Sequence, residues 1–259
     1  MSRPSALAGT IKAKLDKQDI LLMSHIVLGY PSLEANREVI KAMVENGVDL
    51  MELQIPFSEP IADGPTIARA NQASLDGGFK VKEGLQFIRE VVAEFKIPFL
   101  IMTYTNILMA YGMEKFITEA ADLGVKGLII PDIPLEEATD LIAQSRQAGM
   151  DWVQLMTPTS QDERLVKIGA EADGFVYCVA RRGVTGGKTA FDDSVGTFIK
   201  RCRVATHAPL AVGFGVRSPE DVAYLKGKAE IAVVGSAALD LHVKEGAEAV
   251  GQFFKGLRG

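Results

Sequence analysis

The chain has 259 residues, of which 28 are basic and 33 are acidic, so its net charge at neutral pH is −5. A compact chain of this length buries a large core without disulfides or metal ions. Its Lys and Arg residues are scattered, which argues against nucleic-acid binding. No run approaches the roughly 20 apolar residues of a membrane-spanning helix and no signal-peptide pattern precedes the first apolar run, so we expect no membrane association and a cytoplasmic location.

Eight short apolar runs recur along the chain, and each has the length and composition of a buried β-strand. They cover residues 21–28, 48–53, 98–103, 125–130, 152–156, 175–179, 210–214 and 230–234. Segments with helical spacing lie between them; Leu85, Ile88 and Val92, for example, fall on one helix face. Eight strand–helix units predict one (β/α)8 TIM barrel over residues 1–259.

The alternative fold is an open, doubly wound parallel sheet. A dinucleotide-binding sheet of that kind usually has a G-x-G-x-x-G turn after its first strand, and residues 28–31 do not have it. Two intervals are longer than the rest, after the second and sixth strands, and they include residues 54–76 and 181–194. In a barrel, such long loops at the C-terminal face build binding sites and lids.

Polar side chains gather where the predicted strands end. Glu52 interrupts an apolar strand, and a carboxyl group that points into the barrel there can donate and accept protons near neutral pH. A salt-bridged Glu at a strand end is the alternative. Asp63, in the following loop, is either a second site carboxyl group or a cap for the helix that begins near Thr66. Further residues of this kind are Tyr104, Asn106, Asp132, Thr157, Tyr177 and Arg181.

Glycines follow the seventh and eighth strands, in the segments 213–215 and 235–237. Many barrels bind phosphate at these two positions through backbone N–H groups and a helix N-terminus. Glycine permits the close approach of an anion to the backbone. The two segments together favour a phosphorylated ligand.

The sequence gives little support for a metal site or for catalysis through a lysine Schiff base. His25, His207 and His242 are scattered, which does not favour a metal site. No Lys stands at a predicted C-terminal strand end, so Schiff-base catalysis lacks a nucleophile. We therefore expect no metal ion and no cofactor, and we expect Cys178 and Cys202 to be reduced thiols in the core.

The segment 52–66, with the sequence ELQIPFSEPIADGPT, closely resembles the signature of the tryptophan synthase alpha chain family. The resemblance continues through residues 102–106, 127–137, 181–186, 213–215 and 235–237. It implies a TIM barrel that cleaves indole-3-glycerol phosphate to indole and glyceraldehyde 3-phosphate in L-tryptophan biosynthesis. It also implies no metal ion and no lysine imine.

The family's two catalytic carboxyl groups match Glu52 and Asp63. The resemblance implies that Glu52 transfers both protons, while Asp63, ionised, hydrogen-bonds the indole N–H. Thr185 is then expected to reach Asp63. The substrate-binding residues implied in this way are Tyr104, Tyr177, Thr185, Gly186, Phe214, Gly215, Gly235 and Ser236.

The family works with a pyridoxal-phosphate beta chain, so the resemblance implies a heterotetramer of the α2β2 type. Positions that match its partner-facing loops are Pro56, Glu59, Pro60, Asn106 and Pro134. Three alternatives remain open. They are a stand-alone indole-3-glycerol-phosphate lyase that releases free indole, an inactive barrel that activates a beta chain, and a phosphosugar epimerase or isomerase.

The sequence departs from the family's pattern at a few positions. Gln54 stands where Gly is usual, Glu59 where Asp is usual, and Arg182 where a small residue is common. Ser24 and His25 replace a Pro-aromatic pair. We expect none of these departures to touch the two carboxyl groups. We expect Gln54 and Glu59 to affect the strength of coupling to the partner, and His25 to alter the wall of the indole pocket.

Overall fold

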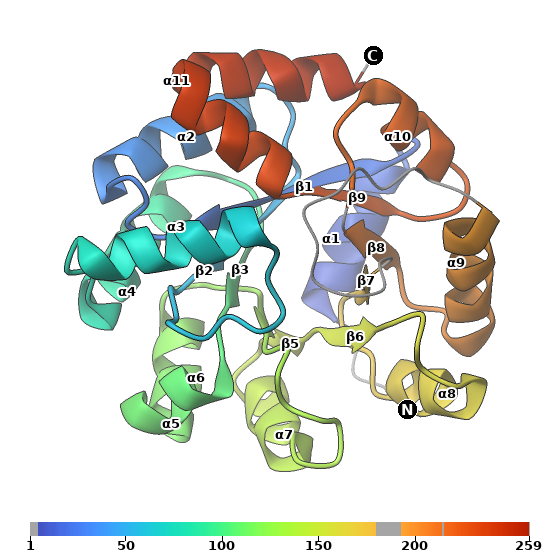
Figure 1. Ribbon diagram of the computed structural model, residues 1–259. Helices are drawn as coiled ribbons and strands as arrows, with labels where there is room; N and C mark the ends of the chain where they lie inside the picture. The colour runs from blue at the N-terminus through green and yellow to red at the C-terminus, as the bar shows by residue number, and fades with distance from the viewer. Residues whose placement is uncertain (1–4, 180–192, 214, 259) are drawn as a thin grey trace.

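The protein folds into a ring of parallel strands surrounded by helices (Figure 1). The computed structural model describes residues 5–179, 193–213 and 215–258. Within them the strands are β1 (Leu21–Val27), β2 (Leu50–Gln54), β3 (Phe99–Met102), β4 (Gly127–Ile129), β5 (Asp151–Trp152), β6 (Gln154–Met156), β7 (Val176–Val179), β8 (Leu210–Gly213) and β9 (Ile231–Val234).

The strand order is β5-β4-β3-β2-β1-β9-β8-β7-β6, and every pairing is parallel. The predicted strand 152–156 is divided at Val153 into β5, which pairs with β4, and β6, which pairs with β7. The N–H of Val153 still donates to the carbonyl of Leu128, at 2.9 Å. One broken strand therefore joins the two ends of the sheet, and the eight predicted strands form the TIM barrel.

Helices cover the outside of the sheet (Figure 1). They are α1 (Ala6–Leu15), α2 (Leu33–Glu45), α3 (Pro65–Asp76), α4 (Val81–Glu94), α5 (Thr105–Tyr111), α6 (Met113–Asp122), α7 (Thr139–Gln147), α8 (Asp162–Ala170), α9 (Asp193–Ala205), α10 (Pro219–Leu225) and α11 (Ser236–Arg258), which bends at Gly246. Helix α3 occupies half of the predicted long loop after β2, so irregular chain covers only residues 55–64 of it. Pro65 starts this helix because its fixed φ suits the first turn.

Alternation along the strands produces two cores. Leu21 and Met23 of β1 face the barrel interior, where they pack with Leu50, Leu100 and Phe175. The residues at the alternate positions of the strands point outward and belong to the larger core that lies between the strands and the helices. Cys178 and Cys202 are buried in that outer core as free thiols, which confirms the prediction.

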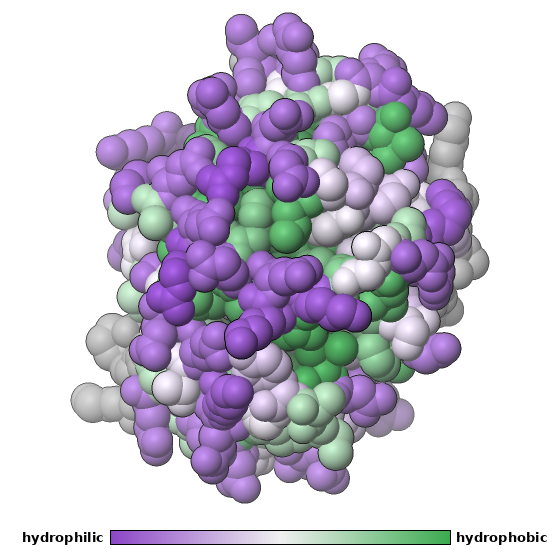
Figure 2. All heavy atoms as spheres, turned by 90° about the vertical axis from the view of Figure 1, so that its left-hand side faces the viewer, coloured by the Kyte–Doolittle hydropathy of each residue, from purple (hydrophilic) through white to green (hydrophobic). Residues whose placement is uncertain are grey.

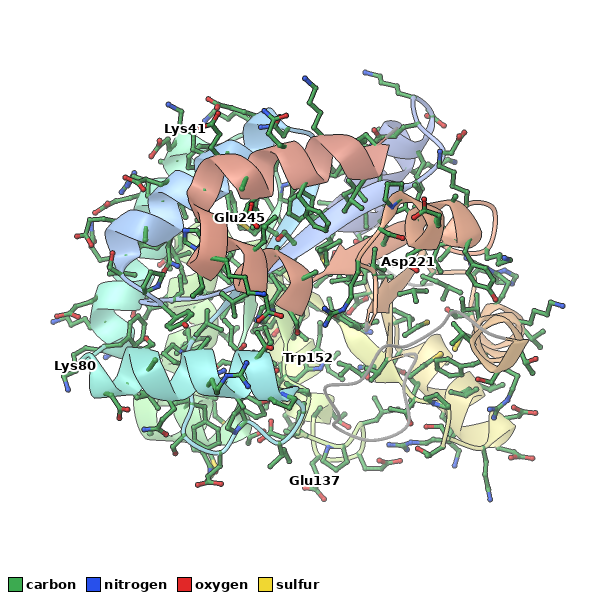
Figure 3. The ribbon with its side chains drawn as sticks, turned by 45° about the horizontal axis from the view of Figure 1, so that its top comes forward. Lys41, Lys80, Glu137, Trp152, Asp221 and Glu245 are labelled. Carbon is green, nitrogen blue, oxygen red and sulfur yellow. The ribbon has the colours of Figure 1, made fainter. Side chains whose placement is uncertain are left out.

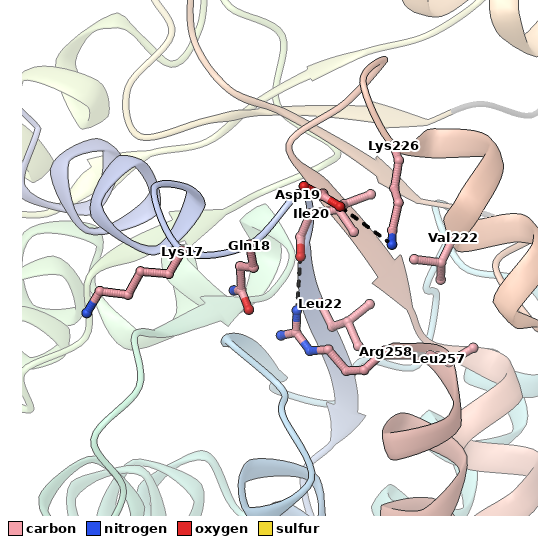
Figure 4. A pocket seen from close by; sticks show the side chains of 9 residues that line it. All are labelled: Lys17, Gln18, Asp19, Ile20, Leu22, Val222, Lys226, Leu257 and Arg258. Carbon is pink, nitrogen blue, oxygen red and sulfur yellow. Dashed lines mark hydrogen bonds and ion pairs between the residues drawn. The ribbon is translucent and has the colours of Figure 1, made fainter.

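The two ends of the barrel differ. Helix α1 closes the N-terminal end, because its Leu7 and Ile11 belong to the interior core. Arg258, near the end of α11, donates to the carbonyls of Ile20, at 3.0 Å, and of Gly47. A cavity of about 240 Å³ lies beside this contact, between the segment 17–20 and α10 (Figure 4). In this fold the N-terminal end contributes stability, so the site is sought at the other end.

Charged side chains cover the outer surface. Lys41, Lys80 and Glu137 are exposed at its edge, whereas Trp152 is buried within the ring of helices (Figure 3). On the face that carries α2 and α4, hydrophilic side chains surround a smaller hydrophobic area (Figure 2). Among the described residues, no helix has the length and apolar character needed to cross a membrane.

Candidate active site

Five polar side chains point into the C-terminal mouth of the barrel. Strands β1 and β2 supply three of them, because His25 of β1 is in register with Glu52 of β2 and Gln54 lies further along β2. Tyr104 follows β3, at the N-cap of α5. Asp63 enters from the loop 55–64. All five side chains are buried. Most of the other described side chains in the barrel interior are apolar, so this cluster marks the place where the chain carries chemistry.

Glu52 is 3% exposed and has two polar partners among the residues that the structure describes. Its Oε1 lies 2.9 Å from Nδ1 of His25. The hydroxyl group of Tyr177, on β7, donates to the same oxygen at 3.3 Å. Because burial and the nearby carboxylate raise the pKa of Tyr177 well above its ordinary value, the phenol stays protonated and remains a donor.

Asp63 is held by a separate pair of donors. Gln54 Nε2 lies 2.6 Å from Oδ2 of Asp63, and the hydroxyl group of Tyr104 donates to the same oxygen at 3.0 Å. Burial raises the pKa of Asp63, while His25, Gln54 and Tyr104 partly offset this rise. The alternative role as a helix cap is wrong, because Gly64 occupies the N-cap of α3 and Asp63 bonds to Gln54 and Tyr104 instead.

Tyr104 also positions the loop that carries Asp63. Its hydroxyl oxygen accepts the N–H of Ala62 at 3.2 Å, and its ring stacks on Phe57 with centroids 5.1 Å apart. The N–H of Phe57 donates to Asn71 on α3. Burial and the charge of Asp63 raise the pKa of Tyr104, so this phenol is a donor at every physiological pH. The loop 55–64 is thus held by Tyr104 and by helix α3.

Two departures from the family's pattern contact the carboxyl groups, so the expectation that none does is wrong. His25 pairs with Glu52, and Gln54 with Asp63. Burial lowers the pKa of His25, but the charge and hydrogen bond of Glu52 raise it, and the net change is a rise. The remaining polar atoms of the two residues, His25 Nε2 and Gln54 Oε1, are buried without a hydrogen-bond partner in the described part of the chain.

Three glycines border the mouth near β8 and β9. A Cβ atom on Gly213 would lie 2.5 Å from the ring of Tyr177, so only glycine leaves room for that ring. Gly215 has φ of 116°, which L side chains rarely adopt. Gly235 directly precedes α11, which begins at Ser236. The first N–H groups of a helix have no partner within it, so this end of α11 can receive an anion.

Several predicted site residues lie outside the described residues. These are Thr185, Gly186 and Phe214, together with Arg182 and most of the predicted long loop 181–194. In the described ranges, no group of three or more His, Cys, Asp or Glu residues is placed to hold a metal ion.

Exposed residues surround the mouth near the loop 55–64. Glu59, Asn106 and Pro134 are exposed, as expected for positions that face a partner. Ile61 and Met109 are apolar and more than half exposed on the same loop and on α5. Pro56 is buried and offers a partner no surface, which corrects the expectation for that residue.

The fold and the site together define an α/β-barrel enzyme that carries two buried, separately held carboxyl groups at its C-terminal mouth. The model of the tryptophan synthase alpha chain family matches residues 11–253. The chain belongs to this family, whose members are lyases that cleave indole-3-glycerol phosphate and pair with a beta chain.

Relatives match along almost the whole chain. The tryptophan synthase alpha chain of Desulfotalea psychrophila is 50% identical over 248 residues, which are 96% of this chain and 98% of the relative. That of Desulforapulum autotrophicum is 47% identical over 251 residues, 97% of this chain and 99% of the relative. A chain of the tryptophan synthase structure from Mycobacterium tuberculosis superimposes with a TM-score of 0.91 at 31% identity, covering 99% of this chain and 98% of that chain.

His25 and Gln54 are the site residues whose contacts sequence reasoning missed. The sequence signal that could have revealed these contacts is the alternation of side chains along a strand, in which every second residue faces the same side. Leu21, Met23 and His25 face one side of β1, and Glu52 and Gln54 face one side of β2. A polar residue at an inward position next to Glu52 was therefore a candidate for contact with it.

Proposed function

We propose that this chain is an alpha subunit that cleaves indole-3-glycerol phosphate to indole and glyceraldehyde 3-phosphate, with Glu52 and Asp63 as its catalytic residues. The observation that carries the proposal is the placement of two buried carboxyl groups in one barrel mouth, each with its own donors. Separate environments allow one carboxyl group to exchange protons while the other stays ionised.

The reaction needs one proton delivered and one removed. Protonation of indole C3 gives an indolenine cation; the bond from C3 to the side chain then breaks, and its electron pair restores the aromatic ring. The hydroxyl group on the departing carbon loses its proton as it becomes the aldehyde. Glu52 is the group proposed to deliver the first proton and to take up the second. Its neighbours His25 and Tyr177 are in a position to hold it toward the reacting carbon.

Asp63 is proposed to stabilise the cation. An ionised carboxylate that accepts the indole N–H offsets the positive charge that develops on the ring. Gln54 and Tyr104 support this role, because hydrogen bonds to a carboxylate favour its ionised form and here oppose the effect of burial.

The phosphate group is proposed to bind backbone N–H groups of Gly186, Gly215 and Gly235, with Ser236 at the start of α11. Support comes from the position of Gly235 and Ser236 at a helix N-terminus beside the mouth. Tyr177, Phe214 and Thr185 complete the proposed pocket, and Tyr104 contributes through Asp63.

An α2β2 assembly with a pyridoxal-phosphate beta chain is the proposed working form. The exposed apolar side chains of Ile61 and Met109, close to Glu59 and Asn106 in the sequence, support a protein contact at this mouth. A stand-alone lyase shares every residue of the proposed site, and only coupling to a beta chain distinguishes the two. The cytoplasmic location expected from the sequence stays a prediction.

The experiment is an assay of the purified chain with indole-3-glycerol phosphate, with and without a tryptophan synthase beta chain. We expect indole and glyceraldehyde 3-phosphate in equal amounts and a faster reaction in the complex. Indole release at the same rate in both conditions favours the stand-alone lyase. Turnover of a phosphosugar with no cleavage of the indole substrate contradicts the proposal.

A further inference from the structure

The contact between His25 and Glu52 is short, buried and isolated from solvent. Nδ1 of His25 lies 2.9 Å from Oε1 of Glu52, and the two residues are 6% and 3% exposed. Their strands are in register at this pair, so the contact is built into the β1–β2 ladder rather than made by a mobile loop. Hydrogen bonds between a buried carboxylate and an imidazole are of the strong, charge-assisted kind.

The surroundings of His25 favour a proton on it. From β2, Glu52 and Gln54 face the imidazole, and Asp63 adds a second negative charge from the loop 55–64. On the other side lies Gly235, which directly follows β9 and has no side chain. The hydroxyl group of Tyr177, from β7, donates to the same oxygen of Glu52. The attraction of the two carboxyl groups outweighs the burial of the ring, and the pKa of His25 is raised.

We propose that His25 is a positioning residue for Glu52, which orients the carboxyl group through Nδ1–H and holds a second proton beside it. In this pair Glu52 exchanges protons with the substrate, and His25 holds the carboxyl group of Glu52 in place through their 2.9 Å contact. Two groups coupled in this way show pH transitions that belong to the pair rather than to either residue. The kinetic side of this inference rests on the proposed function, whereas the titration of the pair does not.

The direct test is an NMR titration of the three histidines in the full chain, with His25 assigned by its absence in His25→Phe. We expect His25 to titrate above 6.5 in the wild type. In Glu52→Gln, burial remains and the charge is lost, so its titration should move down by about 1–3 pH units. A His25 signal whose titration is unchanged by Glu52→Gln overturns the inference. This readout needs no substrate.

The kinetic test compares His25→Phe with His25→Asn. Phenylalanine keeps the aromatic volume without either nitrogen, so we expect kcat to fall about 10-fold with little change in KM. The pH profile of cleavage should also lose the transition contributed by His25, because phenylalanine does not titrate. Asparagine keeps an N–H near the position of Nδ1 but does not titrate. It should restore most of kcat without restoring that transition.

His207 provides the matched control, because it is exposed on a loop outside the site. His207→Gln should keep the wild-type profile and the wild-type titration of His25. A His25→Phe protein that is less stable but has an unmoved profile has lost only packing, and this result overturns the inference. If the wild type does not cleave indole-3-glycerol phosphate at all, the proposed function fails, and the NMR titration still decides whether the pair exists.

Discussion

Gln54 binds the carboxylate of Asp63 at 2.6 Å from a position only two residues beyond Glu52 on the same strand. Strand β2 therefore carries one proposed catalytic carboxyl group and holds the other. A displacement of β2 would therefore act on both carboxyl groups, on Glu52 directly and on Asp63 through the hydrogen bond from Gln54. The family resemblance predicted the two carboxyl groups, and the structure shows that one strand couples them.

Replacement of Glu52 by Gln tests the proposed acid–base role. The amide has nearly the same shape and cannot shuttle a proton, so we expect cleavage of indole-3-glycerol phosphate to fall by about 10²–10⁴-fold. Circular dichroism and binding of glycerol 3-phosphate should stay close to wild type. Glu59→Gln, on the exposed part of the loop 55–64, is the control and should keep full activity without a partner. Wild-type turnover by Glu52→Gln would remove Glu52 from the mechanism.

Asp63→Asn should lower activity and raise stability. Cleavage should fall by about 10²-fold or more, because the variant lacks the charge that stabilises the cation. Burial raises the pKa of Asp63 above 3.8, so the wild type loses stability as the pH rises through that raised pKa. Urea unfolding at neutral pH should show Asp63→Asn as the more stable protein, and the difference should shrink toward pH 3.8. A variant that is less stable at neutral pH contradicts this account.

Gln54→Met removes the donor to Asp63 while keeping a long, unbranched side chain. We expect the free energy of unfolding at neutral pH to fall by about 1.5–3 kcal/mol, since a hydrogen bond to a buried charged group is lost. The pKa of Asp63 should rise further, so the loss of activity should be greatest on the acidic side. Gln72→Met is the matched control, because Gln72 makes a 2.7 Å bond to Asp76 on the surface. Equal unfolding curves for the two variants would show that the buried bond adds nothing.

Gly235→Val tests the phosphate site more cleanly than a change at Gly215. A side chain at Gly215 is strained at φ of 116° whatever binds there, whereas a Cβ on Gly235 would, within the described part of the chain, meet only His25, at 3.6 Å. We expect Gly235→Val to stay folded and to bind glycerol 3-phosphate at least about 10-fold more weakly, because its branched side chain intrudes on the anion. Calorimetric titration measures this. Wild-type affinity would place the phosphate elsewhere.

Glu59→Lys tests the partner surface. Glu59 is exposed beside the apolar Ile61, so its charge can influence association without supporting the fold. We expect charge reversal to weaken binding to a tryptophan synthase beta chain by about 10-fold, mostly through slower association at low salt. The partner-free rate of indole release should not change. A beta chain that binds both proteins equally in sedimentation experiments would direct the search to another face.

The barrel was predictable because its signals are local and repeated. Most inner strands are buried on both faces and are therefore largely apolar runs, as residues 210–213 illustrate. The break at Val153 was not predictable, because it depends on which neighbour each half of the strand pairs with. Sheet closure decides that pairing, and no property of residues 152–156 records it.

The site was predictable as a set of residues but not as a set of contacts. Glu52 and Asp63 are conspicuous as carboxyl groups at strand ends, and the family motif distinguishes them from a salt bridge and a helix cap. His25 and Gln54 were assigned to the pocket wall and to a partner-facing loop, because a sequence comparison by position does not show which side chains meet. The register of His25 with Glu52 brings them together.

The absence of a side chain at Gly213 determines how the protein tolerates mutation at this position. Every residue other than glycine has a Cβ atom, and at this position that atom would occupy the place of the Tyr177 ring, whose hydroxyl group reaches Glu52. Any missense change in the Gly213 codon should therefore act on the active centre from a residue that offers no side chain to it. Random variants of this chain can be screened in cells that must synthesise tryptophan in order to grow. In such a screen, substitutions at position 213 should abolish growth about as often as substitutions at the two carboxyl positions.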